Sequence, residues 1–140
     1  MDPNLKREII LEHYQNPKNK GITNEDGFEL INMNNDSCID EVNVEIKLED
    51  NIIKDIHFDG EACAICTSSS SIMTDTLKGK TIKEARNIIS NFYNMIEDKE
   101  YDKDILEQAC VYDDIAKQPN RKKCALLAWW GAEKILKREK

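Results

Sequence analysis

The chain lacks a hydrophobic run long enough to span a bilayer, and it lacks an excess of basic residues. Its longest apolar run covers residues 125–130, far short of the roughly 20 residues that a transmembrane helix needs. The 20 lysines and arginines are outnumbered by 27 aspartates and glutamates, and the net charge is −7. Nucleic acids and anionic membranes are bound through basic patches, so this balance argues against both as partners.

The chain also lacks internal repeats, low-complexity tracts and linker-like segments. Its 140 residues are enough for one domain, residues 1–140, with a core that needs no disulfides. Residues 1–8 mix acids with bases and are followed by no apolar stretch of the kind found in signal peptides. We therefore expect a cytoplasmic protein, whose thiols stay reduced.

The five cysteines are the most informative residues, and an odd number fits metal ligands and free thiols better than a disulfide framework. Cys38 and Asp40 are two positions apart, and Cys63 and Cys124 follow. Three thiolates and a carboxylate make a suitable tetrahedral set for one zinc or iron ion. The carboxylate binds more weakly than a thiolate, so such a site can open one position for ligand exchange.

The remaining thiols and imidazoles allow other interpretations. Cys63 and Cys66 form a C-x-x-C pair, which suits a redox pair at a helix start or half of a zinc ribbon; the chain has no second pair to complete a ribbon. Cys124 follows three cations but lies on an apolar helical stripe, so a ligand and a core cysteine are equally compatible. Cys110 is expected in the core, and the only two histidines, His13 and His57, in structural roles.

Hydrophobic periodicity predicts an α+β fold, with a small antiparallel sheet between helices. The pattern predicts a helix from Asp2-Pro3 to Asn16, strands over residues 28–33, 41–48 and 52–58, and helices over residues 67–78, 82–95, 102–115 and 119–137. The strand over 41–48 alternates apolar and polar residues, which predicts one buried and one wet face. Asp59-Gly60 is expected to break the sheet. Adjacent Trp129 and Trp130 cannot both face the core, which leaves one of them for a partner surface or a rim position.

Five segments, taken in order, resemble the IscU/NifU-type iron–sulfur cluster assembly proteins over nearly the whole chain. These are residues 13–21 (HYQNPKNKG), 38–40 (CID), 58–63 (FDGEAC), 67–73 (TSSSSIM) and 119–125 (PNRKKCA). Two features resemble the SufU branch. Lys123 stands where IscU proteins have histidine, and the segment between Cys63 and Cys124 is long enough for an extra helical segment.

The resemblance implies a three-stranded sheet packed by helices, with a metal site at one exposed end formed by Cys38, Asp40, Cys63 and Cys124. It implies Zn²⁺ as the cofactor, a SufS-like cysteine desulfurase as the partner, and cluster-assembly or tRNA-thiolation proteins as recipients of the sulfur. SufU-like members take persulfide sulfur from the desulfurase, whereas IscU-like members build a [2Fe–2S] cluster.

Three positions depart from the family pattern. Ile39 replaces a glycine, and Ala62 replaces the glycine before the second cysteine. A β-branched residue tolerates positive φ poorly, so we expect the loop around Ile39 to bend differently. Cys66 stands where serine is common and offers a competing thiol.

Three functions remain as hypotheses. The first is a zinc-bound sulfur acceptor in iron–sulfur cluster biogenesis, in which Cys38 is the reactive thiol and the chain acts as a sulfurtransferase-like acceptor. The second is a scaffold on which a [2Fe–2S] cluster is assembled and handed on. The third is a structural zinc module that only binds proteins. Lys123 and the long segment favour the first.

Overall fold

The computed structural model describes residues 1–35 and 39–138. The elements in chain order are α1 (Pro3–Gln15), β1 (Phe28–Asn34), β2 (Glu41–Glu49), β3 (Ile52–Glu61), α2 (Ala64–Leu77), α3 (Ile82–Ile96), α4 (Lys103–Leu106), the 3₁₀ helices η1 (Glu107–Tyr112) and η2 (Ile115–Lys117), and α5 (Pro119–Lys137). The prediction of an α+β fold is confirmed. That residues 1–140 form one domain stays a prediction.

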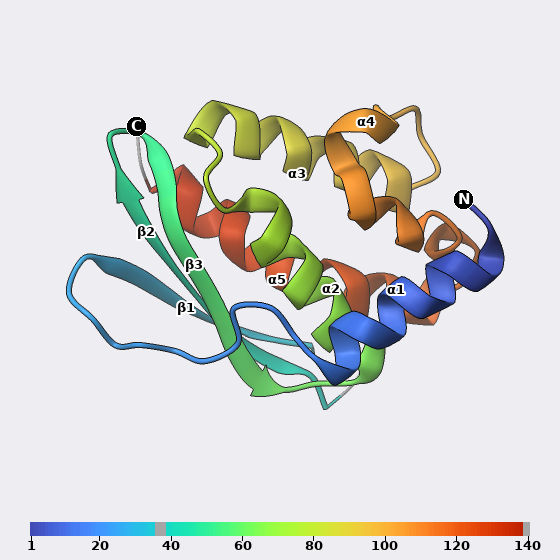
Figure 1. Ribbon diagram of the computed structural model, residues 1–140, viewed down its shortest axis with the longest axis horizontal. Coiled ribbons are helices and arrows are strands. Elements are labelled where there is room, and N and C mark those ends of the chain that lie inside the picture. Colours follow the sequence, from blue (N-terminus) through green and yellow to red (C-terminus); the bar gives the residue numbers. More distant parts are fainter. Residues whose placement is uncertain (36–38, 139–140) are drawn as a thin grey trace.

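The sheet is antiparallel, with strand order β1-β2-β3 within the described residues. Figure 1 shows it on one side of the molecule, with α2 and α5 packed against it and the other helices beyond them. Gly131 lets α5 approach closely, because a Cβ there would lie 3.0 Å from Cγ of Met33. The two central helices, α2 and α5, therefore pack directly on the sheet. Their N-terminal ends lie near the same end of its strands.

The predicted break at Asp59-Gly60 is wrong, because β3 continues to Glu61. Gly60 pairs with Val42 in the β2–β3 ladder and has a φ of +146°. Any Cβ at this position would collide with the backbone oxygen of Glu41. Glycine thus allows the strand to continue, and the ladder reaches the pair Glu41↔Glu61 at the end of the sheet.

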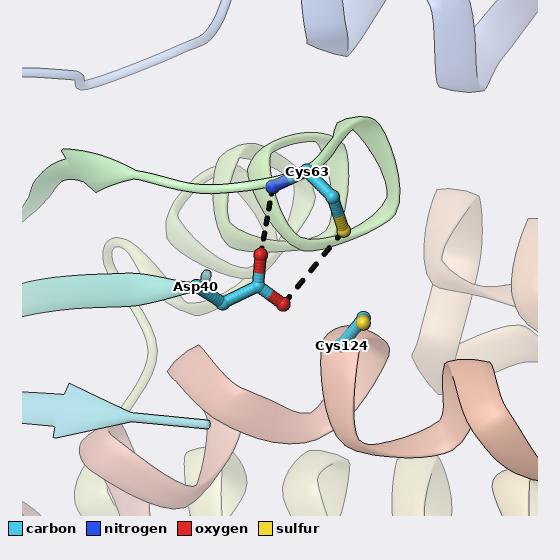
Figure 2. Close-up of side chains that lie close together, drawn as sticks. All are labelled: Asp40, Cys63 and Cys124. Atoms are coloured by element: carbon cyan, nitrogen blue, oxygen red, sulfur yellow. Dashed lines mark hydrogen bonds between the residues drawn. The ribbon is translucent and has the colours of Figure 1, made fainter. Parts of the chain in front are cut away.

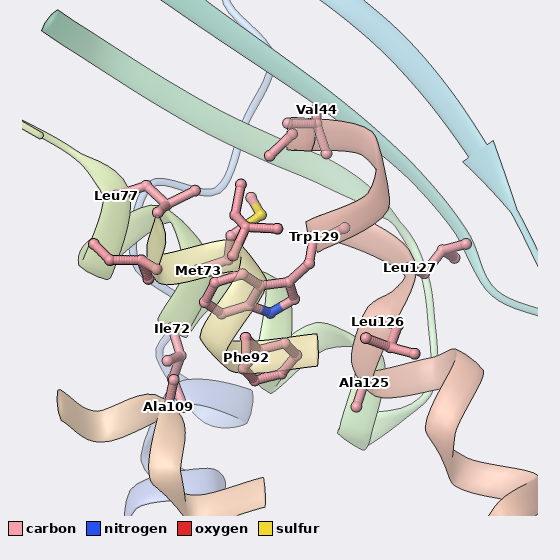
Figure 3. Packing of buried hydrophobic residues seen from close by; sticks show 14 of the residues in the cluster. Val44, Ile72, Met73, Leu77, Phe92, Ala109, Ala125, Leu126, Leu127 and Trp129 are labelled. Atoms are coloured by element: carbon pink, nitrogen blue, oxygen red, sulfur yellow. The ribbon is translucent and has the colours of Figure 1, made fainter. Parts of the chain in front are cut away.

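The core lies between the sheet and the central helices and continues among the helices (Figure 3). Trp129 is fully buried and stacks on Phe92 with ring centroids 3.9 Å apart, an arrangement that adds about 0.5–1.5 kcal/mol beyond area burial. Trp130 is half-buried at the edge of this core. The expectation that the adjacent tryptophans would not both be buried is confirmed.

Two helix predictions need correction. The helix predicted over 102–115 is broken into α4 and η1, because Glu107 adopts φ 50° and ψ −123°, which no α-helix continues through. The helix predicted to begin at residue 67 begins at Ala64, since the Cys63 side chain serves as its N-cap. The other caps agree with the sequence: Asp2 caps α1, and Thr81 and Glu84 form a capping box at the start of α3.

The expected wet face of β2 is covered at one position. Glu45 is buried, and its Oε2 accepts hydrogen bonds from the amide and hydroxyl of Thr23 at 3.1 and 2.9 Å. Oε2 also lies 2.8 Å from Nδ1 of His57. The segment before β1 therefore crosses this face of the sheet. His13 is likewise held structurally, within 2.7 Å of Ser71 Oγ, so the structural role predicted for both histidines is confirmed.

Across residues 1–35 and 39–138, none of the helices combines the length and the apolar character that crossing a membrane requires.

Candidate metal site

Asp40, Cys63 and Cys124 come together at the end of the sheet where α2 and α5 begin (Figure 2). Asp40 directly precedes β2, Cys63 is the N-cap of α2, and Cys124 lies in the second turn of α5. Their potential ligand atoms all lie within 4.8 Å of one another. Three residues far apart in the sequence thus present two thiols and a carboxylate to one point.

The sheet register explains this convergence. The pair Glu41↔Glu61 places the start of β2 beside the end of β3, so Asp40 reaches the turn into α2. Asp40 Oδ1 accepts a hydrogen bond from the Cys63 amide at 2.7 Å, and Asp40 Oδ2 lies 3.7 Å from Cys63 Sγ. Tetrahedral Zn–S and Zn–O distances put neighbouring ligand atoms roughly 3.5–3.8 Å apart. The spacing and donor types therefore fit a zinc ion.

Two of the three site residues are buried and Cys63 is half-buried, and this burial alters the ionisation of their side chains. Burial raises the pKa of the Asp40 carboxyl, but hydrogen bonds from Cys63 and neighbouring side chains outweigh it and bring the pKa below its ordinary value. Burial also raises the pKa of the Cys63 and Cys124 thiols, and the Asp40 charge adds to the rise. Without a metal, the carboxylate is therefore ionised and the two thiols hold their protons at neutral pH.

The other predicted site residues lie as follows. Cys38 falls outside the described residues, so its part in the site stays a prediction. Cys66 is fully buried in the first turn of α2, and burial strongly raises the pKa of its thiol. Cys110 is half-buried in η1 against the core, and its Sγ lies 3.5 Å from the Lys103 carbonyl oxygen. The described cysteines are all free thiols.

A buried polar contact fixes α2 against α5 near the cluster. The hydroxyl of Ser69 donates to the carbonyl oxygen of Ala125 at 2.6 Å and accepts from Trp129 Nε1 at 3.0 Å. Ala125 directly follows Cys124, so this contact holds the Cys124 turn against the helix that begins at Cys63. The serine-rich start of α2 thus cross-links the two thiol-bearing helices.

A cavity of about 660 Å³ opens beside Cys63. Arg7 of α1 and Arg121 of α5 line it together with Cys63. The cavity gives one side of the cluster access to solvent and a cationic lining. Cys63 is half-buried, whereas Asp40 and Cys124 are buried.

The sequence interpretation missed Asn35 as a neighbour of the cluster. Its side-chain nitrogen lies 3.8 Å from Cys124 Sγ, across 89 positions of sequence. Asn35 belongs to a polar run that reads as a turn, and nothing in its local pattern points to a thiol so far away. The connection of Ser69 to α5 was missed for the same reason.

Comparison with known proteins agrees with the fold. The family model for the NifU-like N-terminal domain matches residues 5–129. The zinc-dependent sulfurtransferase SufU of Bacillus subtilis is 39% identical over 136 residues, covering 96% of this chain and 91% of that protein. The iron–sulfur cluster assembly scaffold protein IscU of Streptococcus pyogenes is 34% identical over 135 residues, covering 96% and 84%.

A solved structure extends this similarity to three dimensions. A candidate iron–sulfur cluster assembly scaffold protein for the SUF system, from the thermophile Fervidobacterium islandicum AW-1, is similar with a TM-score of 0.81 and 33% identity. The match covers 92% of this chain and 94% of that one. The predicted resemblance to IscU/NifU-type proteins and their SufU branch is confirmed, and the chain belongs to the NifU-like N-terminal domain family.

Proposed function

We propose that this protein acts in iron–sulfur cluster biogenesis as a zinc-bound acceptor of persulfide sulfur from a cysteine desulfurase. The observation that carries the proposal is the convergence of Asp40, Cys63 and Cys124 within 4.8 Å, in a chain 39% identical to a zinc-dependent sulfurtransferase. Cys38 would complete the ligand set. When bound, zinc would supply a redox-inert cation that keeps the thiolates ionised and in place.

The thiol chemistry falls to Cys38, which we propose as the sulfur acceptor. Its thiolate attacks the terminal sulfur of the desulfurase persulfide. The sulfur–sulfur bond of the donor breaks, the donor cysteine leaves as a thiolate, and Cys38 becomes the persulfide, so the exchange needs no added oxidant or reductant. Cys63 caps α2 and Cys124 is held within α5, which makes the segment preceding Asp40 the more suitable carrier of the reactive thiol.

The partners and the location belong to the same proposal. A SufS-like desulfurase would supply the sulfur, and cluster-assembly or tRNA-thiolation proteins would receive it. Free thiols at the site need a reducing compartment, which is why we propose the cytoplasm.

A scaffold for a [2Fe–2S] cluster is the second candidate function. The 34% identity to an IscU scaffold favours it, and the same four side chains could hold iron and sulfide as cargo. A structural zinc module that only binds proteins is the candidate from another class. It accounts less well for a carboxylate in the ligand set, because structural zinc sites are normally closed by four cysteines or histidines.

Metal analysis and sulfur mapping test the proposal together. Protein purified without added metal should contain about one zinc ion per chain and be colourless. Incubation with a cysteine desulfurase and cysteine should add sulfur to Cys38, located by mass spectrometry. Cys38→Ser should abolish both the added sulfur and any stimulation of desulfurase turnover.

Three outcomes would contradict the proposal. A brown protein with iron and acid-labile sulfide would favour the scaffold. Zinc without sulfur acceptance would favour the structural module. Sulfur found on Cys66 in the Cys38→Ser variant, with turnover still stimulated, would move the acceptor role to Cys66.

A further inference from the structure

Each of the three described site residues accepts a hydrogen bond from an N–H group. The Cys66 amide donates to Cys63 Sγ at 3.4 Å, and the Cys63 amide donates to Asp40 Oδ1 at 2.7 Å. The third donor is the side chain of Asn35, whose Nδ2 donates to Cys124 Sγ at 3.8 Å. The first two donors belong to the backbone. Asn35 alone among these three uses a side chain that substitution can remove.

The charge of the site makes such donors necessary. The two described thiolates and the carboxylate carry three negative charges, one more than a divalent cation offsets, and the proposed ligand Cys38 would add a fourth. Asp40 and Cys124 are buried, so water cannot solvate the excess charge there. N–H groups that donate to anions are strong partners in such surroundings. The N–H groups that hydrogen-bond the ligands therefore affect the affinity of the site for a metal ion.

The surroundings of Asn35 hold its amide in place. Asn35 directly follows β1 and is 6% exposed. Its backbone N–H donates to the Asp40 carbonyl oxygen at 3.1 Å, which joins the residue after β1 to the residue before β2. Its side chain is one of the groups whose hydrogen bonding lowers the pKa of the Asp40 carboxyl against the effect of burial. One residue thus contacts ligands from two different elements, the start of β2 and α5.

We propose that Asn35 is a positioning residue of the metal site, whose side-chain amide holds Cys124 and Asp40 in their ligating arrangement and sets the affinity for zinc. The inference rests on the zinc site of the proposed function. It assigns to Asn35 no contact with the metal and no part in sulfur exchange. Its effect is on metal retention.

The test compares zinc affinity in Asn35→Asp and Asn35→Ala by competition with a chromogenic chelator. Asn35→Asp keeps the shape but replaces the donor with another acceptor beside a thiolate. Both variants keep the backbone N–H that donates to Asp40. We expect each to weaken zinc binding by about 10- to 100-fold, with the larger loss in Asn35→Asp. Asn34→Ala is the matched control, because the neighbouring Asn34 amide is exposed and donates to Asn32 instead.

Cobalt substitution supplies a readout that a structural role would not move. Removing an N–H donor from a thiolate raises the energy of the sulfur lone pair. The sulfur-to-cobalt charge-transfer band of Asn35→Ala should therefore shift to longer wavelength than in the wild type and in Asn34→Ala. Thermal unfolding of the metal-free variants, followed by circular dichroism, checks that they fold.

The outcomes separate this inference from the proposed function. If the wild type binds no zinc, the proposed function fails first. The positioning role is overturned if the wild type binds zinc and the zinc affinity of both Asn35 variants lies within a factor of about two of the wild-type value. That change is well below the loss expected when a hydrogen-bond partner of a metal ligand is removed. The positioning role is also overturned if affinity falls while the cobalt band stays in place, because the effect then comes from the fold.

Discussion

At the scale of single residues, the four described thiols differ in what surrounds them. Cys63 and Cys124 point toward Asp40, whereas Cys66 lies within α2 and Cys110 in η1 against the core. A thiol that ligates contributes through the metal, and a packed thiol contributes only through its volume. Replacing Cys63 or Cys124 by serine should therefore remove bound zinc, whereas replacing Cys66 or Cys110 should leave it bound.

We expect Cys63→Ser and Cys124→Ser to lose bound zinc and to melt at a lower temperature than the wild type, because metal binding is coupled to folding. Cys110→Ser and Cys66→Ser should keep zinc, although Cys66→Ser also places a hydroxyl in a fully buried position. Metal content by atomic emission and thermal melts measure both effects. Loss of zinc in Cys66→Ser with retention in Asp40→Ala would make Cys66 the fourth ligand.

Most of the candidate ligands could be predicted from the sequence, but the residues that hydrogen-bond them could not. Cys63, Cys124 and Asp40 were identified by residue type and by their order along the chain, with the family resemblance to weigh Cys124 as a ligand against a core cysteine. Asn35 could not be found this way, because an asparagine in a polar run is typical of a turn. Only the folded chain brings it to Cys124.

At the scale of elements, the site depends on how α2 is held against α5. Ser69 provides a buried polar link, since its hydroxyl joins the Ala125 carbonyl to the Trp129 indole. Ser70 is buried beside it but donates to Cys66 within its own helix, at 2.7 Å. The two serines form a matched pair, because one bonds between helices and the other within a helix.

We expect Ser69→Ala to lower the free energy of unfolding by about 2 kcal/mol, because it leaves the buried Trp129 N–H without its partner. Ser70→Ala should cost distinctly less, since the Cys66 carbonyl keeps its place in the helix ladder. Urea denaturation followed by tryptophan fluorescence measures both. Equal losses in the two variants would show that the contact between the helices contributes nothing beyond the burial of a serine.

The type of most elements followed from periodicity, whereas their ends and interruptions did not. The alternation over 41–48 predicted β2 correctly, but it could not show that Glu45 would be covered by the segment containing Thr23. Gly60 read as a breaker because glycine often ends strands; here the close approach of the Glu41 backbone requires it within the ladder. The apolar pattern over 102–115 gave no sign of the positive φ at Glu107, where α4 ends.

At the scale of the whole molecule, the candidate metal site lies where the sheet, α2 and α5 meet. Asp40 directly precedes β2, Cys63 caps α2 and Cys124 lies within α5. A metal bound among them would act as a cross-link between the sheet and both central helices. Its removal should therefore affect the stability of the entire fold.

Zinc-loaded and metal-free protein should respond to pH with opposite signs. In the metal-free protein, burial raises the pKa of Cys63 and Cys124 above that of an unfolded thiol, about 8.5. The contribution of these protonated thiols to the free energy of unfolding is fully present below the unfolded pKa. It is lost as the pH rises through the folded pKa. Zinc needs the thiolates, so protons compete with the metal and zinc stabilises less as pH falls. The difference in melting temperature between the two forms should therefore widen from about pH 6 to about pH 9.

Differential scanning fluorimetry of zinc-loaded and chelator-treated protein, at matched ionic strength, measures this difference directly. Cys124→Ser is the control, because it removes one raised thiol and one ligand together and should flatten the pH dependence of the difference. A difference that stays constant or narrows toward alkaline pH would mean that the thiols are not the groups that bind the metal. The cross-link between the sheet and the helices would then have to be assigned to other side chains.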